Sequence, residues 1–260
     1  MNVMVFDIET VPDVTAGRRL YDLDGLSDAD VAQAMFQLRM AKTGNDFLPH
    51  HLQRVVAISV VFRTRDAVRV WSLGDEDADE AELIKRFFDG VERYTPTLVS
   101  WNGGGFDLPV LHYRSLLHGV SAPRYWDVGG DDREFRYNNY LGRYHWRHVD
   151  LMDVLAGYQP RANAPLDEVA AMIGLPGKMG MSGAKVWDAF QAGDLAGIRN
   201  YCETDVLNTY LVYLRFQHLR GLLDDTGYAD EQERVRAMLG ESEAAHLHEF
   251  LDAWLGGAAK

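Results

Sequence analysis

The sequence predicts an α/β fold, a mixed five-stranded sheet flanked by helices, with extra helices at the C-terminal end. Short apolar runs at 3–6, 97–101 and 149–151 suit strands, and helical patterns separate them, which is typical of parallel strands joined by crossovers. Two further apolar runs, 54–63 and 67–72, are close enough to form a β-hairpin. The hairpin and the crossovers together favour a mixed sheet whose antiparallel edge comes early in the chain.

The composition is that of a globular protein. Of 260 residues, 47% are hydrophobic, which is enough for a sizeable core. Neither a signal peptide nor a membrane span is expected, because the first apolar run ends at Asp7, and a cytoplasmic protein with no membrane partner follows. One cysteine, Cys202, excludes an intramolecular disulfide. The net charge of -13 argues against nucleic acid, but screening over about 8 Å leaves room for a local basic groove.

The first element is a short buried strand, residues 3–6, followed by two acids. Asp7 and Glu9 point to the same side of an extended chain, while Phe6 and Ile8 point to the other. Two neighbouring carboxylates repel each other unless they are protonated or neutralised, and a hard cation such as Mg²⁺ is a suitable partner. The pattern by itself also fits a strand that runs into a solvated acidic turn.

Residues 11–52 form a long connection, which we expect to be an insertion that covers one side of the sheet and carries no chemistry. A capping box at Ser27 opens a helix from Asp30 to Lys42. After the hairpin, residues 75–93 have helical periodicity and lead into the strand at 97–101.

That strand ends in Asn102-Gly103-Gly104-Gly105-Phe106-Asp107, immediately before a helix over 108–118. Three glycines remove side chains from a turn at the carboxyl end of a strand, where open α/β sheets bind their ligands. The same residues also fit a tight turn without function, with Asp107 acting only as a charge at the helix start.

Residues 133–148 combine four arginines, two histidines and five aromatics with a single glutamate. Arginines neutralise phosphates and aromatic rings stack on unpaired bases, so Arg136, Arg143 and Tyr144 are candidates for gripping a single strand. A surface loop with its aromatics in the core is the alternative. For the nearby His148 and Asp150, a hydrogen-bonded structural role is favoured over a third metal site.

The last strand, 149–151, precedes helices at 165–173 and 184–191, with Lys178 in the loop between them. A long helix over 195–220 carries Tyr201 and Asp205, which share one face a single turn apart. One or two amphipathic helices follow at 229–255. The expected organisation is a domain of residues 1–220 with a helical extension, 221–260, packed on it.

Three motifs now stand in order: Phe-Asp-x-Glu-Thr at 6–10, Asn-x₃-Phe-Asp at 102–107 and Tyr-x₃-Asp at 201–205. Together they resemble the motifs of the DEDD exonuclease superfamily, in its tyrosine-containing branch. With Arg143-Tyr144, residues 148–153 and residues 174–178, the wider pattern resembles the predicted 3'-5' exonucleases related to the proofreading domain of family B DNA polymerases. The resemblance covers residues 1 to about 220.

The resemblance implies a ribonuclease H-like fold and two divalent ions, Mg²⁺ or Mn²⁺. It implies that Asp7 bridges both ions, that Glu9 and Asp205 complete the first, and that Asp107 holds the second mainly through water. Two ions about 4 Å apart suit in-line hydrolysis of a phosphodiester, because they serve the attacking and the leaving oxygen at once. Tyr201 is expected to orient the attacking water.

Substrate contacts are expected from Thr10, Asn102 and Phe106 at the terminal nucleotide. Lys178 is either a phosphate contact or a solvated lysine. The sequence thus predicts a stand-alone metal-dependent 3'-5' exonuclease acting on single-stranded DNA, with its oligomeric state open. An exoribonuclease, a non-catalytic nucleic-acid-binding module and a hydrolase of small phosphate esters are the alternatives.

Overall fold

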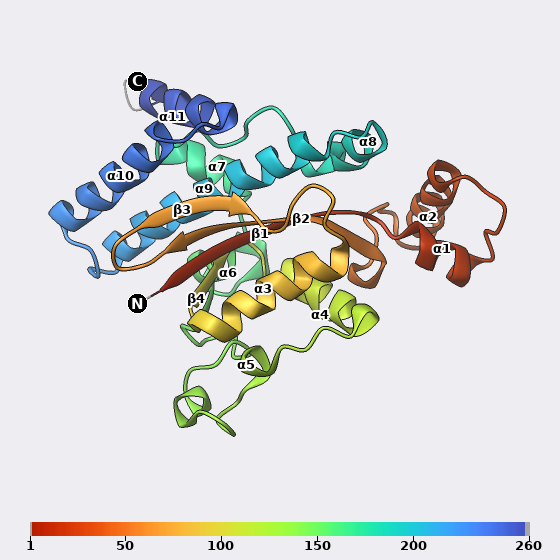
Figure 1. Ribbon diagram of the computed structural model, residues 1–260, viewed down its shortest axis with the longest axis horizontal. Helices are drawn as coiled ribbons and strands as arrows, with labels where there is room; N and C mark the ends of the chain where they lie inside the picture. Colours follow the sequence, from red (N-terminus) through yellow and green to blue (C-terminus); the bar gives the residue numbers. More distant parts are fainter. Residues whose placement is uncertain (1, 258–260) are drawn as a thin grey trace.

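The computed structural model describes residues 2–257, in which five strands form one mixed sheet of order β3-β2-β1-β4-β5 (Figure 1). The central strand β1 (Val3–Pro12) pairs antiparallel with β2 (Gln53–Arg63), which pairs antiparallel with β3 (Val68–Ser72). On its other side β1 pairs in parallel with β4 (Thr97–Ser100), and β4 in parallel with β5 (His148–Asp150). The predicted mixed sheet with an early antiparallel edge is therefore confirmed.

Helices cover both faces of the sheet: α3 and α4 lie on one face, and α7 and α9 on the other (Figure 1). None of the helices within residues 2–257 is long and apolar enough to cross a membrane. The helices are α1 (Val14–Tyr21), α2 (Asp28–Thr43), α3 (Glu80–Tyr94), α4 (Asp107–His118), α5 (Pro123–Trp126), α6 (Leu151–Leu155), α7 (Leu166–Met172), α8 (Val186–Gln191), α9 (Leu195–Leu219), α10 (Asp225–Gly240) and α11 (Ala245–Gly257).

Strand β1 separates two hydrophobic cores. Val3 and Val5 pack with α9, whereas Phe6 and Ile8 pack with α3 and α4. This division follows from the strand period of two, since neighbouring side chains point to opposite faces. Asp7 and Glu9 continue the row of Val3 and Val5, so they point toward α9.

The predicted end of the first strand at residue 6 is wrong. β1 continues to Pro12 because its ladder with β2 continues, with a register shift between Glu9 and Thr10. Backbone pairing does not depend on the side chains being apolar, so acids on one face do not end the strand. Asp7 and Glu9 consequently lie inside a central strand, which excludes a solvated acidic turn.

The expectation that residues 11–52 cover one side of the sheet is also wrong. Residues 13–52, called the arm below, lie beyond one end of the sheet (Figure 1). The arm includes α1, a helix that the sequence patterns did not indicate, and it has its own small core with Val31, Met35, Leu48 and Leu52. With a core of its own, the arm does not need the sheet to bury its apolar side chains.

A buried ion-pair network attaches the arm to the body. Arg114 of α4 binds Asp13 at the start of the arm and Glu80 at the start of α3, and all three side chains are 5–7% exposed. His118 also contacts Glu80, at 2.7 Å. The charges are paired and hydrogen-bonded, which buried charges require.

The C-terminal helices share the core of α9. Leu239 of α10 and Leu247, Phe250 and Trp254 of α11 are buried in the same cluster as Tyr210. Arg63 of β2 binds the Glu231 carboxylate of α10 through two hydrogen bonds of 2.7 and 2.5 Å. The tail thus forms two helices packed on the sheet layer.

Candidate active site

Carboxylates from three distant segments meet beside β1, past the end of β4. β4 pairs with β1 only as far as Val5, so the β1 backbone beyond it is free on that side. There the Ile8 N–H donates a hydrogen bond to Asp107 Oδ1, at 3.2 Å. Because β4 is short, the first residue of α4 reaches the strand that carries Asp7 and Glu9.

Helix α9 brings the remaining two residues, since it packs across β1 and β2. The Tyr201 phenol is hydrogen-bonded to the Asp205 carboxylate one turn along, as the spacing predicts. Between them, the Cys202 Sγ donates to the main-chain oxygen of Asp7 at 3.4 Å and to its Oδ2 at 3.6 Å. Ligand atoms of Asp7, Glu9 and Cys202 all lie within 4.8 Å of one another.

Burial and mutual repulsion perturb all four carboxylates. Burial, followed by the charges of neighbouring acids, raises the pKa of Asp7 and of Glu9 well above their usual values. Burial raises the pKa of Asp107 to about 7 and that of Asp205 to about 6. A carboxylate cluster with this much strain favours either protons or cations.

The donor set fits a divalent metal. Glu9 is 7% exposed, yet within residues 2–257 no hydrogen bond to its carboxylate is found. Burying a carboxylate without a donor or counter-charge is costly, and a cation removes that cost. Carboxylate oxygens suit hard ions such as Mg²⁺ and Mn²⁺, so Asp7, Glu9, Asp107 and Asp205 are the residues that would hold them.

The glycine turn is sterically demanding. Asn102 adopts a left-handed backbone with φ 64°. A Cβ at Gly103 would lie 2.3 Å from Ser100 Oγ, and one at Gly105 would lie 2.4 Å from Asn102 Oδ1. Alanine at either position would require the turn to move, so these glycines are needed for the backbone path itself.

Asp150 and His148 hold this turn in place. Asp150 accepts hydrogen bonds from the N–H groups of Asn102 and Gly104, both at 2.9 Å. His148 Nε2 lies 2.8 Å from Ser100 Oγ, and burial lowers the His148 pKa to about 4. This is the hydrogen-bonded role that we expected for the pair, and it positions the segment that leads to Asp107.

A groove of about 470 Å³ leads away from the turn and includes Asn102 and Arg143 in its wall. Arg143 binds the Asp153 carboxylate through two hydrogen bonds of 2.7 Å and lies over the Tyr158 ring. Tyr144 is 67% exposed and packs edge-on against Tyr158. The structure therefore brings two predicted substrate residues, Asn102 and Arg143, to one groove.

Other predicted substrate residues lie elsewhere. Arg136 is outside the lining of this groove, and its Nε donates to the Gly129 carbonyl oxygen at 3.3 Å. Within the arginine and aromatic stretch, Phe135 and Tyr140 are buried in the core, whereas Tyr137 is 84% exposed. The stretch therefore combines both alternatives considered for it, core packing and exposed rings.

Three predicted contacts lie beside the carboxylates. The Thr10 hydroxyl donates to Gln53 Oε1 at 3.0 Å. Lys178 lines a hollow of about 200 Å³ together with Tyr201 and Asp205, and its charge lowers the Asp205 pKa. Phe106 is half-buried and directly precedes Asp107.

The patterns did not indicate four residues at the site. Asp167 lines the hollow beside Asp205 and raises its pKa, and Cys202 contacts Asp7. Phe47 and His50 of the arm lie against Phe106. No local periodicity connects these positions with the motifs, so only the tertiary structure reveals them.

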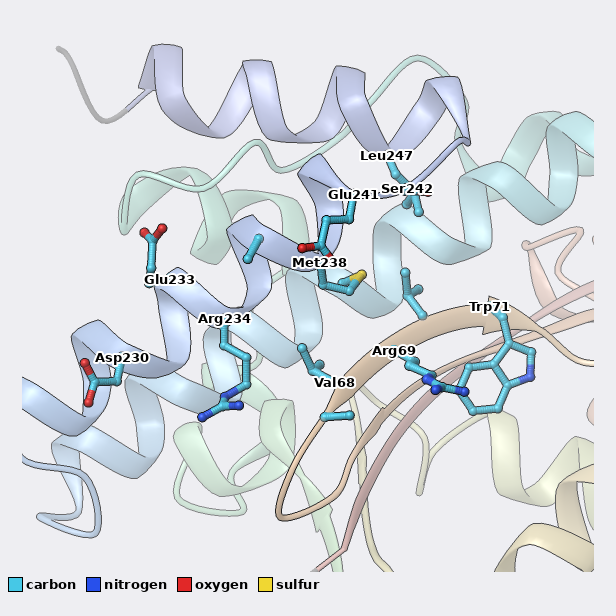
Figure 2. A pocket seen from close by; sticks show the side chains of 13 residues that line it. Val68, Arg69, Trp71, Asp230, Glu233, Arg234, Met238, Glu241, Ser242 and Leu247 are labelled. Atoms are coloured by element: carbon cyan, nitrogen blue, oxygen red, sulfur yellow. The ribbon is translucent and has the colours of Figure 1, made fainter.

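The largest cavity is elsewhere. A hollow of about 1110 Å³ lies between β3 and α10, where Arg69, Trp71, Arg234 and Met238 line it (Figure 2). None of the four clustered carboxylates belongs to its lining. The candidate site is thus identified by its chemistry and not by its size.

The comparison with known families decides the class. Residues 45–254 match the model of the predicted 3'-5' exonucleases related to the exonuclease domain of PolB. The chain belongs to this family. Membership in this PolB-related exonuclease family agrees with the ribonuclease H-like arrangement of the sheet, and exonuclease domains of this kind use divalent metals.

Two curated relatives are polymerases. The chain is 25% identical over 152 residues to the catalytic subunit of DNA polymerase epsilon from Saccharomyces cerevisiae, which covers 54% of this chain and 6% of the relative. It is 26% identical over 145 residues to the same polymerase subunit from Dictyostelium discoideum, which covers 55% of this chain and 6% of that protein. The matched region is a small part of each polymerase.

Proposed function

We propose that this exonuclease-family protein hydrolyses phosphodiester bonds from the 3' end of single-stranded DNA by a two-metal-ion mechanism. The supporting observation is the meeting of Asp7, Glu9, Asp107 and Asp205 in a half-buried cluster next to Tyr201. We assign Asp7 to both ions, Glu9 and Asp205 to one, and Asp107 to the other. When bound, such ions activate a water and stabilise the leaving oxygen.

The residues around the cluster orient the substrate. Burial and the neighbouring acids raise the Tyr201 pKa, so its phenol keeps its proton. Tyr201 therefore acts as a hydrogen-bond donor that orients the attacking water, and not as a base. The glycine turn exposes Gly104 and Gly105, which lets the sugar-phosphate backbone approach Asp107 closely.

The single strand extends along the groove that passes Asn102 and Arg143. Arg143 supplies positive charge there, and the exposed Tyr144 supplies an aromatic ring near the same groove. No contact that would distinguish a 2'-hydroxyl from hydrogen stands out among the described residues, so an exoribonuclease is the second candidate.

A degradation ladder tests the proposal. Purified protein is incubated with 5'-labelled single-stranded DNA and matching RNA, in Mg²⁺, in Mn²⁺ and in chelator. Asp7→Asn should lower the rate by about 100-fold or more, because it weakens a ligand shared by both ions. Asp66→Asn, in the exposed hairpin turn, is the matched control and should behave as wild type.

The ladder has three informative outcomes. Metal-dependent shortening from the 3' end that is lost in Asp7→Asn supports the proposal, and the faster strand gives the sugar preference. Near wild-type activity of Asp7→Asn would contradict the metal assignment. Absence of shortening on both strands would favour a nucleic-acid-binding module without catalysis.

A further inference from the structure

The arm places an exposed aromatic ring next to the glycine turn. Phe47 is 55% exposed, and its ring centroid lies 5.5 Å from that of Phe106, with the planes inclined at 56°. Phe106 directly precedes Asp107. An exposed ring thus continues an aromatic surface that begins one residue from a catalytic carboxylate.

The backbone of Phe47 is held although its ring is free. Its N–H donates to Asn45 Oδ1 at 2.7 Å, and its carbonyl oxygen accepts from Arg39 Nε at 3.0 Å. The next residue, Leu48, is buried in the arm's core. A ring fixed in this way loses little further freedom when a planar ligand binds to it, which favours affinity.

Two polar links attach this part of the arm to the site. His50 Nε2 lies 3.0 Å from the carbonyl oxygen of Gly105, and its ring is 5.7 Å from Phe106. Gln53, which follows the arm, donates to the Leu48 carbonyl oxygen at 3.1 Å and accepts from Thr10 at 3.0 Å. The arm therefore contacts both the glycine turn and the end of the strand that carries Glu9.

We propose that Phe47, together with Phe106 and His50, forms a subsite that stacks on the nucleobase at the 3' terminus of the substrate. This inference rests on the proposed function and deepens it, since it assigns part of substrate binding to the arm. Every base has a π-face, so such a surface accepts all four bases. The arm is thus a substrate-positioning element with Phe47 as its contact.

A fluorescent base tests the stacking directly. 2-Aminopurine at the 3' end of a single-stranded DNA is titrated with protein in Ca²⁺, a hard cation that binds oxygen ligands as Mg²⁺ does. Wild type should quench the fluorophore on binding, Phe47→Ala should lose most of the quenching, and Phe47→Trp should retain it. Leu38→Ala, another exposed apolar residue of the arm, is the control and should quench as wild type does.

Kinetics with an abasic 3' terminus separates stacking from folding effects. Phe47→Ala should raise KM about tenfold on an ordinary terminus and leave KM on the abasic terminus unchanged, because a stacked base contributes about this much. An equal effect on both termini would overturn the inference, as would quenching that is the same in Phe47→Ala and wild type. If wild type shortens no strand, the proposed hydrolysis fails, and the fluorescence titration still decides on the subsite.

Discussion

Replacing Asp107 by asparagine should make the metal-free protein more stable while it weakens metal binding. The amide oxygen of asparagine can still accept the hydrogen bond from Ile8 N–H, so the local geometry is kept. What changes is the charge, because Asp107 is 3% exposed beside other acids.

The magnitude follows from the Asp107 pKa, which burial raises from 3.8 to about 7. An acid whose folded pKa is raised contributes stability at low pH, and this stability is lost as pH rises from the unfolded to the folded value. Asparagine does not titrate. The stability advantage of Asp107→Asn over wild type should therefore grow by about 2–3 kcal/mol between pH 5 and pH 8, at about 1.36 kcal/mol per pKa unit.

Urea unfolding in chelator at pH 5 and pH 8 measures this difference. Mn²⁺ at pH 8 should then raise the stability of wild type more than that of Asp107→Asn, because a ligand stabilises the fold according to its affinity. A stability difference that stays constant between pH 5 and pH 8 in chelator would refute the electrostatic reasoning. An equal response of both proteins to Mn²⁺ would remove Asp107 from the metal ligands.

Three further substitutions test other parts of the site. Tyr201→Phe should keep the fold but lower kcat by about 10- to 100-fold, the equivalent of one hydrogen bond to a charged group, as measured by single-turnover kinetics; an unchanged rate would reduce the phenol to packing. Asp150→Ala removes the acceptor of two turn N–H groups and should raise KM and cost about 1–3 kcal/mol in urea unfolding; wild-type values for both would mean that the turn holds itself. Arg114→Ala leaves two buried carboxylates unpaired and should destabilise the fold by about 3–5 kcal/mol, and a loss below about 1 kcal/mol would contradict the network.

The sequence predicted most of the fold because its elements have strong local signals. The hairpin, the later parallel strands and the long helix with Tyr201 and Asp205 are confirmed. The errors fall in the first fifty residues. There β1 extends past its acids because pairing with β2 continues, and the arm lies at the end of the sheet because its own core satisfies it.

By itself the sequence determined which side chains share a face, because strand and helix periods are properties of the backbone. Asp7 with Glu9, and Tyr201 with Asp205, are pairs of this kind. Only the tertiary structure decided that these pairs meet Asp107, since that depends on where β4 stops pairing with β1. It also decided the raised carboxylate pKa values and the place of Phe47, because burial and long-range contacts depend on packing between segments far apart in the chain.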